Sequence, residues 1–325
     1  MQAGSIPIEQ GVCALCGAEK GAKLASGTDF EYRTTDTEFR LWRCACGGVF
    51  LNPRPAPAAL ATIYPANYYS YNFEEKLGPL VMRFKALTER AKMRAYESYL
   101  KPGARILDIG CGDGHLLSQL EAGYPEKLEL EGVEFSEHGV NATEAAGYRV
   151  HIGTIEEVEL PAHAFDLVIL NQLIEHVRDP QAVLERIAAA LAPGGHLFIE
   201  TPNIDSWDAR IFRRRYWGGY HLPRHFHLFD TSSLARLVAN AGLRCVVQRP
   251  LVCPQFWIIS VQNWLKDKGA NRLAGFISPF NPLLLAPATA IEILQQRLGW
   301  TSNQQLIAQA GESPPARESA RQTAR

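Results

Sequence analysis

The chain has 325 residues, of which 46% are apolar and 21% are charged, and this composition excludes a disordered or fibrous protein. The length allows two domains, or one large domain with an appendage. Because 33 Lys and Arg residues nearly balance 34 Asp and Glu residues, no global charge draws the chain to nucleic acid or to an anionic membrane.

The first ten residues lack a basic stretch followed by an apolar run, which predicts no signal peptide and a cytoplasmic location. Four of the seven cysteines follow as two close pairs: Cys13, Cys16, Cys44 and Cys46. Such pairs are typical of two turns that supply four thiolates to one structural zinc ion. The single residue between Cys44 and Cys46 departs from the usual two, so reduced core cysteines or a labile disulfide remain alternatives. We predict a zinc-ribbon-like leader and connector over residues 1–72.

The connector contains Asn52-Pro-Arg-Pro and four tyrosines, at positions 64, 68, 69 and 71. Apolar residues at helical spacing then predict an amphipathic helix over residues 79–100. From there strand and helix patterns alternate, which indicates a doubly wound α/β fold with a mainly parallel sheet. We predict strands at 105–109, 128–135, 149–152, 165–170, 195–200, 243–249 and about 304–309, and helices that include 180–192 and 231–241.

An insertion rich in Trp, Phe and Pro, about residues 250–302, precedes the last strand, and we expect it to be helical and to form a cap or a dimer surface. Its uncharged stretch from Leu273 to Ile291 contains three prolines, which argue against a membrane-spanning helix and leave peripheral membrane contact open. Residues 311–325 predict a disordered tail.

The most informative segment runs from Ile106 to Leu117, where a buried strand leads into three alternating glycines and then a helix. Glycine lets backbone amides approach a ligand closely, and the helix N-terminus offers unpaired N–H groups. Glu134 ends the next strand, 24 residues after Gly110, where a carboxylate can accept both hydroxyls of an adenosine ribose.

With these features the chain resembles the class I S-adenosylmethionine-dependent methyltransferases, at least over residues 102–250. Five motifs carry the resemblance: Leu107-Asp-Ile-Gly-Cys-Gly-Asp-Gly114, Gly132-Val-Glu-Phe-Ser136, Phe165-Asp-Leu-Val-Ile-Leu170, Asn171-Gln-Leu-Ile-Glu-His-Val177 and Leu191-Ala-Pro-Gly-Gly-His-Leu-Phe-Ile-Glu200. The paired cysteines, Asn52-Pro-Arg-Pro, Thr201-Pro-Asn and Pro223-Arg-His225 are similar to a bacterial subgroup with a ribbon-like leader. A dinucleotide dehydrogenase or a non-catalytic domain is the alternative.

The resemblance implies a Rossmann-like sheet of seven strands with the last antiparallel, in a domain of residues 73–310 that binds S-adenosylmethionine. It also implies the residues that contact this cofactor: Asp108, Gly110, Cys111, Gly112, Gly114, Glu134, Phe135, Thr154, Ile155, Asn171 and Leu173, with Glu156 beside them. Cys111 fits a small side chain packed under the cofactor better than a nucleophile.

His176 follows the fourth predicted strand of this domain, at the sheet edge where ligands bind, and is our candidate general base. Its alternative role is to orient the cofactor loop or to cap the next helix, and we expect the adjacent Glu175 to orient His176 or to face solvent. His225 is the second candidate base or acceptor contact. His221, His225 and His227 are better explained as pocket lining or core residues than as metal ligands.

The segment from Ser206 to Asp230 has a local charge of +3 and interleaved aromatic residues. Its arginines (Arg210, Arg213, Arg214, Arg215 and Arg224) predict a lid that clamps an anionic acceptor, with a solvated arginine surface as the alternative.

We therefore predict methyl transfer to a small-molecule acceptor, through a hydroxyl of a sugar, a quinol-like compound or a lipid-linked compound. Carbon and nitrogen acceptors stay open. Asn171-Gln-Leu-Ile stands where many amino-group DNA methylases carry Asn-Pro-Pro-aromatic, so DNA is disfavoured. RNA methylation, which the near-zero net charge disfavours, and a non-catalytic cofactor-binding scaffold are the alternatives. The sequence does not predict an oligomeric state.

Overall fold

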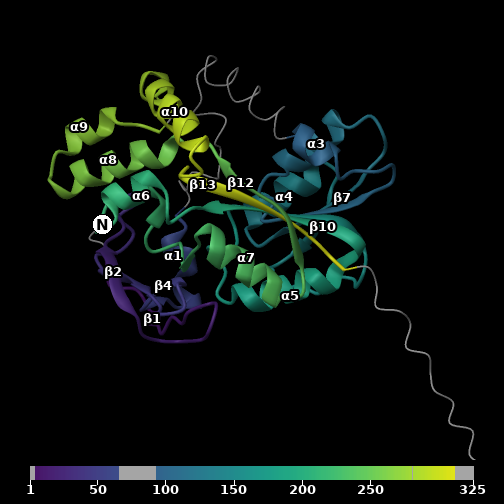
Figure 1. The fold of residues 1–325 in the computed structure, drawn as a ribbon, viewed down its shortest axis with the longest axis horizontal. Coiled ribbons are helices and arrows are strands. Elements are labelled where there is room, and N and C mark those ends of the chain that lie inside the picture. Colours follow the sequence, from purple (N-terminus) through teal and green to yellow (C-terminus); the bar gives the residue numbers. More distant parts are fainter. Residues whose placement is uncertain (1–3, 66–92, 280, 312–325) are drawn as a thin grey trace, which may run out of the picture.

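The computed structural model describes residues 4–65, 93–279 and 281–311 of the chain (Figure 1). Residues 93–97 are helical, and the rest of the helix predicted over residues 79–100 lies mostly outside the described residues. Tyr68, Tyr69, Tyr71 and the predicted tail beyond Gly311 also lie outside them.

A seven-stranded sheet in the order β12-β13-β10-β9-β6-β7-β8 forms the centre of the fold. Its strands are β6 (Arg105–Ile109), β7 (Glu129–Glu134), β8 (Arg149–Ile152), β9 (Phe165–Asn171), β10 (Leu191–Pro202), β12 (Arg244–Leu251) and β13 (Asn303–Gln309). The strands from β8 across to β10 are parallel, and β13 is antiparallel to both of its neighbours. The predicted fold class, with its antiparallel last strand, is confirmed.

Helices cover both faces of this sheet because its strands alternate their apolar residues between two cores. Leu107 and Ile109 of β6 pack with α5 (Pro180–Ala190) and α7 (Thr231–Asn240), whereas Ile106 packs with α3 (His115–Gly123) on the other face. Figure 1 shows α4 (Glu137–Ala145) beside α3, on the side of the sheet away from α5 and α7. The glycine loop between β6 and α3 therefore lies at the carboxyl edge of the parallel strands.

The leader contains β1 (Ile8–Glu9), β2 (Ala22–Gly27), β3 (Phe39–Arg43), β4 (Val49–Leu51) and β5 (Arg54–Pro55), followed by η1 (Pro57–Ala59) and α1 (Leu60–Ile63). Strands β2, β3 and β4 form an antiparallel sheet whose fourth strand is β11 (His227–Leu228). His227 pairs with Phe50 and Leu228 with Val49. The leader thus forms one sheet with a segment that follows β10, rather than a separate body.

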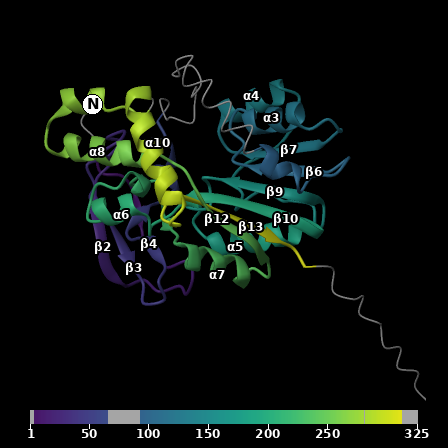
Figure 2. The same ribbon diagram turned by 45° about the horizontal axis from the view of Figure 1, so that its top comes forward.

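The same segment shares a core with the leader. It includes α6 (Trp207–Phe212) and η3 (Gly218–Tyr220), which lie beside the leader sheet (Figure 2). Phe39 and Leu41 of β3 pack in one buried cluster with Trp217, Tyr220 and Phe226. This shared core places the leader against the residues that follow β10, where we predicted acceptor contacts.

The insertion before β13 is helical, as predicted: α8 (Gln255–Asp267), α9 (Asn271–Phe276) and α10 (Pro282–Gln296). These helices project from one end of the molecule (Figures 1 and 2). Within the described residues, no helix combines the length and apolar character that crossing a membrane requires. A cap or dimer role for the insertion stays a prediction.

Candidate active site

The glycine loop after β6 has a backbone that only glycine adopts without strain. Gly110, Gly112 and Gly114 have φ values of 78°, 56° and 78°. A Cβ on Gly112 would meet no atom within 4 Å, whereas one on Gly110 would lie 3.2 Å from Cδ1 of Leu173. The loop is therefore open at Gly112 and contacts the β9 side of the sheet at Gly110, which is consistent with the predicted cofactor site.

Glu134, at the end of β7, connects this loop to the neighbouring strand. Its Oε2 accepts a hydrogen bond from the amide of Gly112 at 3.0 Å, and its Oε1 accepts from the amides of Phe135 at 3.0 Å and Ser136 at 2.7 Å. Phe135 is 52% exposed beside it, and Asp108 is buried near the end of β6. The structure thus brings the predicted methionine-contacting and ribose-contacting residues to one edge, and their roles stay predictions.

Other predicted cofactor residues divide into exposed and buried ones. Asn171 is exposed at the end of β9 and Thr154 is partly exposed after β8. The side chain of Ile155 is buried in the main core, so only its backbone is available to an adenine ring. Cys111 is also buried, and burial raises the pKa of its thiol to about 12. A protonated, packed thiol supports the packing role over the nucleophilic one.

Three histidines from two distant segments meet beside this edge. The ring centroids of His176 and His225 are 4.5 Å apart, and that of His221 lies 5.0 Å from His225 and 6.2 Å from His176. His176 lies in a turn, in which its own amide donates to the carbonyl of Leu173. Leu173 is the residue whose side chain lies next to Gly110 of the glycine loop. His227 is not in the cluster: it is in β11, and its Nε2 lies 3.3 Å from the carbonyl of Arg178.

Backbone carbonyls fix which nitrogen of each ring carries hydrogen. Nδ1 of His176 lies 3.1 Å from the carbonyl of Arg224, and Nδ1 of His225 lies 2.8 Å from that of Gly219. Because a carbonyl can only accept, we assign the hydrogen of both rings to Nδ1 and the lone pair to Nε2. The hydroxyl of Tyr64, 3.0 Å from the same nitrogen of His176, is then an acceptor there. Burial and neighbouring positive charge lower the pKa of His176 to about 3 and that of His225 well below its usual value. Both rings are therefore neutral near pH 7.

Glu175 is a buried carboxyl group next to these rings. Its Oε2 accepts from Oγ1 of Thr201 at 2.9 Å, and its Oε1 has no partner among the described residues. Burial raises its pKa to about 8. We expected Glu175 to orient His176 or to face solvent, and the structure shows neither. One donor atom each of Glu175, His176 and His225 lie within 4.8 Å of one another, a spacing that suits proton transfer and that a metal ion could also span.

Two leader residues complete the cluster, and no sequence pattern indicates them. The hydroxyl of Tyr64 lies 3.0 Å from Nδ1 of His176, and the Tyr64 ring lies 6.3 Å from that of Phe135 on the cofactor side. Oε1 of Glu31 lies 2.8 Å from Nδ1 of His221. These pairs join positions more than a hundred residues apart, so no local spacing could reveal them.

The five arginines predicted to clamp an anion do not act together. Arg224 is fully buried in an ion pair with Asp29, and its guanidinium lies 4.5 Å from the centroid of the Tyr32 ring. Arg215 pairs with Glu38 and Asp267, while Arg210 pairs with Asp205. The prediction that Arg224 contacts an acceptor is therefore wrong: a buried guanidinium needs a paired carboxylate, and Asp29 supplies it. Arg43, Arg210 and Arg213 line a separate cavity of about 280 Å³.

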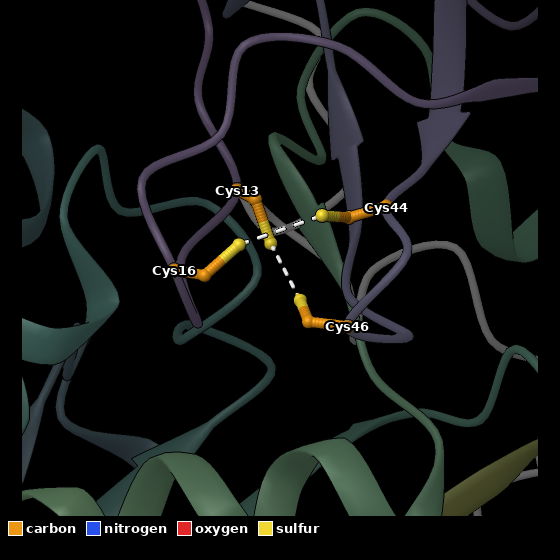
Figure 3. Close-up of side chains that lie close together, drawn as sticks. All are labelled: Cys13, Cys16, Cys44 and Cys46. Carbon is orange, nitrogen blue, oxygen red and sulfur yellow. Dashed lines mark hydrogen bonds between the residues drawn. The ribbon is translucent and has the colours of Figure 1, made fainter.

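The four leader cysteines converge as predicted (Figure 3). The sulfur atoms of Cys13 and Cys46, and those of Cys16 and Cys44, are 3.4 Å apart, and all four lie within 4.8 Å of one another. These distances exclude disulfides and suit tetrahedral zinc, whose ligand sulfurs lie about 3.8 Å apart when each Zn–S bond is about 2.3 Å. A Cβ on Gly48 would lie 2.6 Å from Sγ of Cys13, so this glycine permits the close approach. The donor set fits a structural zinc ion.

Comparison with known proteins identifies the family to which the chain belongs. The profile described as a methyltransferase domain matches residues 81–248, which is more than half of the chain. The ubiquinone biosynthesis O-methyltransferase of Idiomarina loihiensis is 30% identical over 164 residues, which are 46% of this chain and 65% of that protein. The protein of the same name from Xanthomonas axonopodis pv. citri is 37% identical over 160 residues, 44% of this chain and 63% of the relative. The chain thus spans less than two thirds of either relative.

Among solved structures, phosphoethanolamine N-methyltransferase 2 of Haemonchus contortus, in complex with S-adenosyl-L-methionine, matches with a TM-score of 0.51 at 17% identity. The match covers 89% of this chain and 68% of that one, and it supports the fold. The profile match, together with the sheet order and the glycine loop, shows that the chain belongs to the class I S-adenosylmethionine-dependent methyltransferases.

Proposed function

We propose that the protein transfers the methyl group of S-adenosylmethionine to a hydroxyl oxygen of a small, quinol-like acceptor. The observation that carries the proposal is the pair of neutral histidines, His176 and His225, whose rings lie 4.5 Å apart. The amide of His176 bonds the carbonyl of Leu173, whose side chain lies next to Gly110 of the glycine loop. The names of the curated relatives support a quinol-like acceptor over a sugar.

The residues proposed to hold the cofactor are Asp108 and the glycine loop for its methionine part, Glu134 for its ribose, and the segment around Thr154 for its adenine. When bound, the cofactor supplies an electrophilic methyl group on a sulfonium. Phe135 and Tyr64 lie between this position and His176 and would exclude water from the space between donor and acceptor. Alignment of the two reactants can contribute roughly 7–11 kcal/mol, the largest part of the acceleration.

His176 is the proposed general base. As the bond between the acceptor oxygen and the methyl carbon forms and the carbon–sulfur bond breaks, Nε2 of His176 takes the hydroxyl proton. With a pKa of about 3 the ring is a weak base, but it can accept this proton because the forming bond to the methyl carbon makes the hydroxyl proton strongly acidic. The carbonyl of Arg224 holds the hydrogen on Nδ1 so that Nε2 stays available. The adjacent Glu175 carboxyl, whose pKa burial raises to about 8, is mostly protonated near pH 7 and therefore stays neutral beside the ring.

The experiment that tests the proposal measures turnover with labelled S-adenosylmethionine and a short-chain hydroquinone or catechol. We expect an O-methylated product, and His176→Ala should reduce kcat by about 10² to 10⁴ fold, the usual contribution of a positioned base. Cofactor affinity should stay unchanged in this variant. A product methylated on nitrogen or carbon, or full turnover of His176→Ala, would contradict the assignment.

For the leader we propose one structural zinc ion on Cys13, Cys16, Cys44 and Cys46, with all four positions taken by thiolates and none open for catalysis. Metal analysis of the purified protein tests this, with one equivalent of zinc expected. Since none of the seven thiols is paired in a disulfide, we also propose the reducing cytoplasm as its location.

The boundaries 1–72 and 73–310 remain our proposed division of the chain. The division point lies outside the described residues, and the β4–β11 pairing crosses it. RNA methylation stays the second candidate, and the observation in its favour is one cavity lined by Arg43, Arg210 and Arg213. Binding of RNA that weakens steeply with salt would favour it.

A further inference from the structure

The helical insertion carries most of the exposed large apolar side chains of the protein. Among the described residues fourteen such side chains are exposed, and nine of them lie between positions 264 and 300. Leu283 is 81% exposed, Phe276 75% and Leu294 57%. Single exposed apolar residues are ordinary on a protein surface, but a concentration of this kind marks a site of interaction.

Helix α10 is inverted relative to an ordinary surface helix. Its buried face carries Ala288, Glu292 and Gln295, whereas the opposite face exposes Leu283, Pro287, Ile291 and Leu294 at intervals of three or four residues. No charged side chain interrupts that stripe from Pro282 to Gln296, because the one acid in the helix, Glu292, points inward.

Hydrogen bonds fix this orientation. Oε1 of Glu292 accepts from Nε1 of Trp257 at 3.1 Å and from Oγ of Ser302 at 2.6 Å, while Oε2 accepts from the amides of Cys253 at 3.1 Å and Ser302 at 3.2 Å. Rotating α10 to bury its apolar stripe would remove a buried carboxyl group from all of these donors. The outward apolar face is therefore built into the fold.

The exposed charges between Lys268 and Trp300 have one sign, and the preceding acid, Asp267, is paired with Arg215. From Lys268 to Trp300 the charged residues are Lys268, Arg272, Glu292 and Arg297, and the three basic side chains are exposed while the acid is buried. An apolar surface with a basic margin complements a bilayer that carries anionic headgroups. A second copy of the chain would instead bring the same three cations against their equivalents with no exposed acid of this stretch between them.

We propose that the α9–α10 face, defined by Leu273, Phe276, Leu283, Ile291, Ile293 and Leu294, docks on the surface of an anionic lipid bilayer. Its apolar side chains enter the headgroup and acyl boundary, and Lys268, Arg272 and Arg297 contact the headgroups. Figure 1 shows α9 and α10 at one end of the molecule, far from β7.

Helix α8 connects this face to the histidine cluster. The Oγ of Ser260 accepts from the amide of Gly218 at 2.8 Å, and Nζ of Lys266 donates to the carbonyl of Glu31 at 3.4 Å. Glu31 is the partner of His221. Docking would thus bring the active site near a bilayer that dissolves quinol-like acceptors. This advantage rests on the proposed function, but the docking proposal itself is independent of the methyl acceptor.

The test is co-sedimentation of the full chain with phosphatidylcholine vesicles, with and without phosphatidylglycerol, and no methyl donor or acceptor is present. We expect binding to the anionic vesicles that weakens as salt is added. The double variant Leu283→Gln, Leu294→Gln should bind at least about tenfold more weakly, since each exposed leucine contributes to apolar partitioning. Val246→Gln, at a similarly exposed position on β12, is the matched control and should bind like the wild type.

A triple variant, Lys268→Gln with Arg272→Gln and Arg297→Gln, tests the three basic side chains. It should lose the preference for anionic vesicles. Unfolding midpoints of all variants establish that each is folded. Equal binding of wild type and the Leu283, Leu294 variant would overturn the proposal. So would a wild type that ignores vesicles and dimerises in sedimentation velocity through the same leucines, because the face would then serve a second copy.

Discussion

The ion pair between Arg224 and Asp29 is the interaction whose removal should most clearly reveal how the leader is joined to the active site. Both side chains have no exposed surface, and Nη2 of Arg224 lies 2.8 Å from Oδ2 of Asp29. The guanidinium also donates to the carbonyls of Ile63 at 2.6 Å and Leu222 at 3.3 Å. Arg224 is therefore the point where the β2–β3 loop, the end of α1 and the histidine segment meet.

The magnitude follows from what a substitution leaves behind. In Arg224→Met the Asp29 carboxylate stays buried with hydrogen bonds only from Thr34 and the amide of Tyr32. Breaking a buried pair in this way costs about 3–5 kcal/mol of folding free energy, because an uncompensated charge remains. The double variant Asp29→Asn, Arg224→Met removes both charges. Its loss of folding free energy should therefore be smaller, by about 1–3 kcal/mol, than the sum of the losses in the two single variants.

The pH dependence has a definite sign. Burial raises the pKa of Asp29, but the hydrogen bond and charge of Arg224 outweigh it and hold this pKa below the usual 3.8. In the wild type this pair therefore contributes stability above about pH 4 and loses it as pH falls through the folded-state pKa. Without Arg224 the pKa of Asp29 rises, so the destabilisation of Arg224→Met should be larger at pH 7 than at pH 4.5.

Urea unfolding followed by circular dichroism measures these differences. The matched control is Arg215→Met, whose pairs with Glu38 and Asp267 are partly exposed and should cost less than about 1 kcal/mol. The reasoning would be refuted if the losses of folding free energy in the two single variants simply added up to that of the double variant. It would also be refuted if Arg224→Met lost no more folding free energy than the control.

Three further predictions concern the cofactor site, the cysteines and the buried histidines. Glu134→Ala should weaken S-adenosylmethionine binding in calorimetry by about tenfold or more, since a ribose loses its charged partner, while Glu137→Ala on the exposed start of α4 should not. Cys13→Ser with Cys16→Ser should release zinc and lower the unfolding midpoint, and an unchanged metal content would contradict the zinc site. Burial lowers the pKa of His227 to about 4, so between pH 6.5 and 4 its imidazole is protonated in the unfolded chain but not in the folded one. This difference should lower the folding free energy of the wild type by up to about 3 kcal/mol. His227→Gln should lack this part of the loss in urea unfolding at the two pH values.

The central sheet could be predicted because its information is local. Strand β6 was predicted at residues 105–109 and forms there, since a short apolar run between turn residues has few other stable conformations. The glycine loop was equally accessible, because three left-handed positions in five residues require glycine. The cysteine pairs were visible for the same reason: each turn is a local motif.

The active site was predicted only in part, because its contacts are long-range. His176 was found from its place at the strand edge, but Tyr64 reaches it across 112 positions and Glu31 reaches His221 across 190. Arg224 was predicted to clamp an anionic acceptor, because nothing in the sequence indicates that Asp29 neutralises it in the core. Strand β11 has two residues, too few for any periodicity, and its pairing with β4 exists only in the folded chain.

These long-range contacts join the leader, with its four converging cysteines, to the candidate active site. The amide of Cys44 bonds the carbonyl of Gly48, which closes the turn between β3 and β4, and Phe50 in β4 pairs with His227. His227 is two residues from His225, so the register set at the cysteine turn also sets where the His225 ring lies. The matched methyltransferase profile begins after the leader and includes neither Glu31 nor Tyr64. We therefore expect the fold that the profile matches to hold the methyl donor and the leader to form part of the wall on the acceptor side, so loss of zinc should reduce turnover more than cofactor binding.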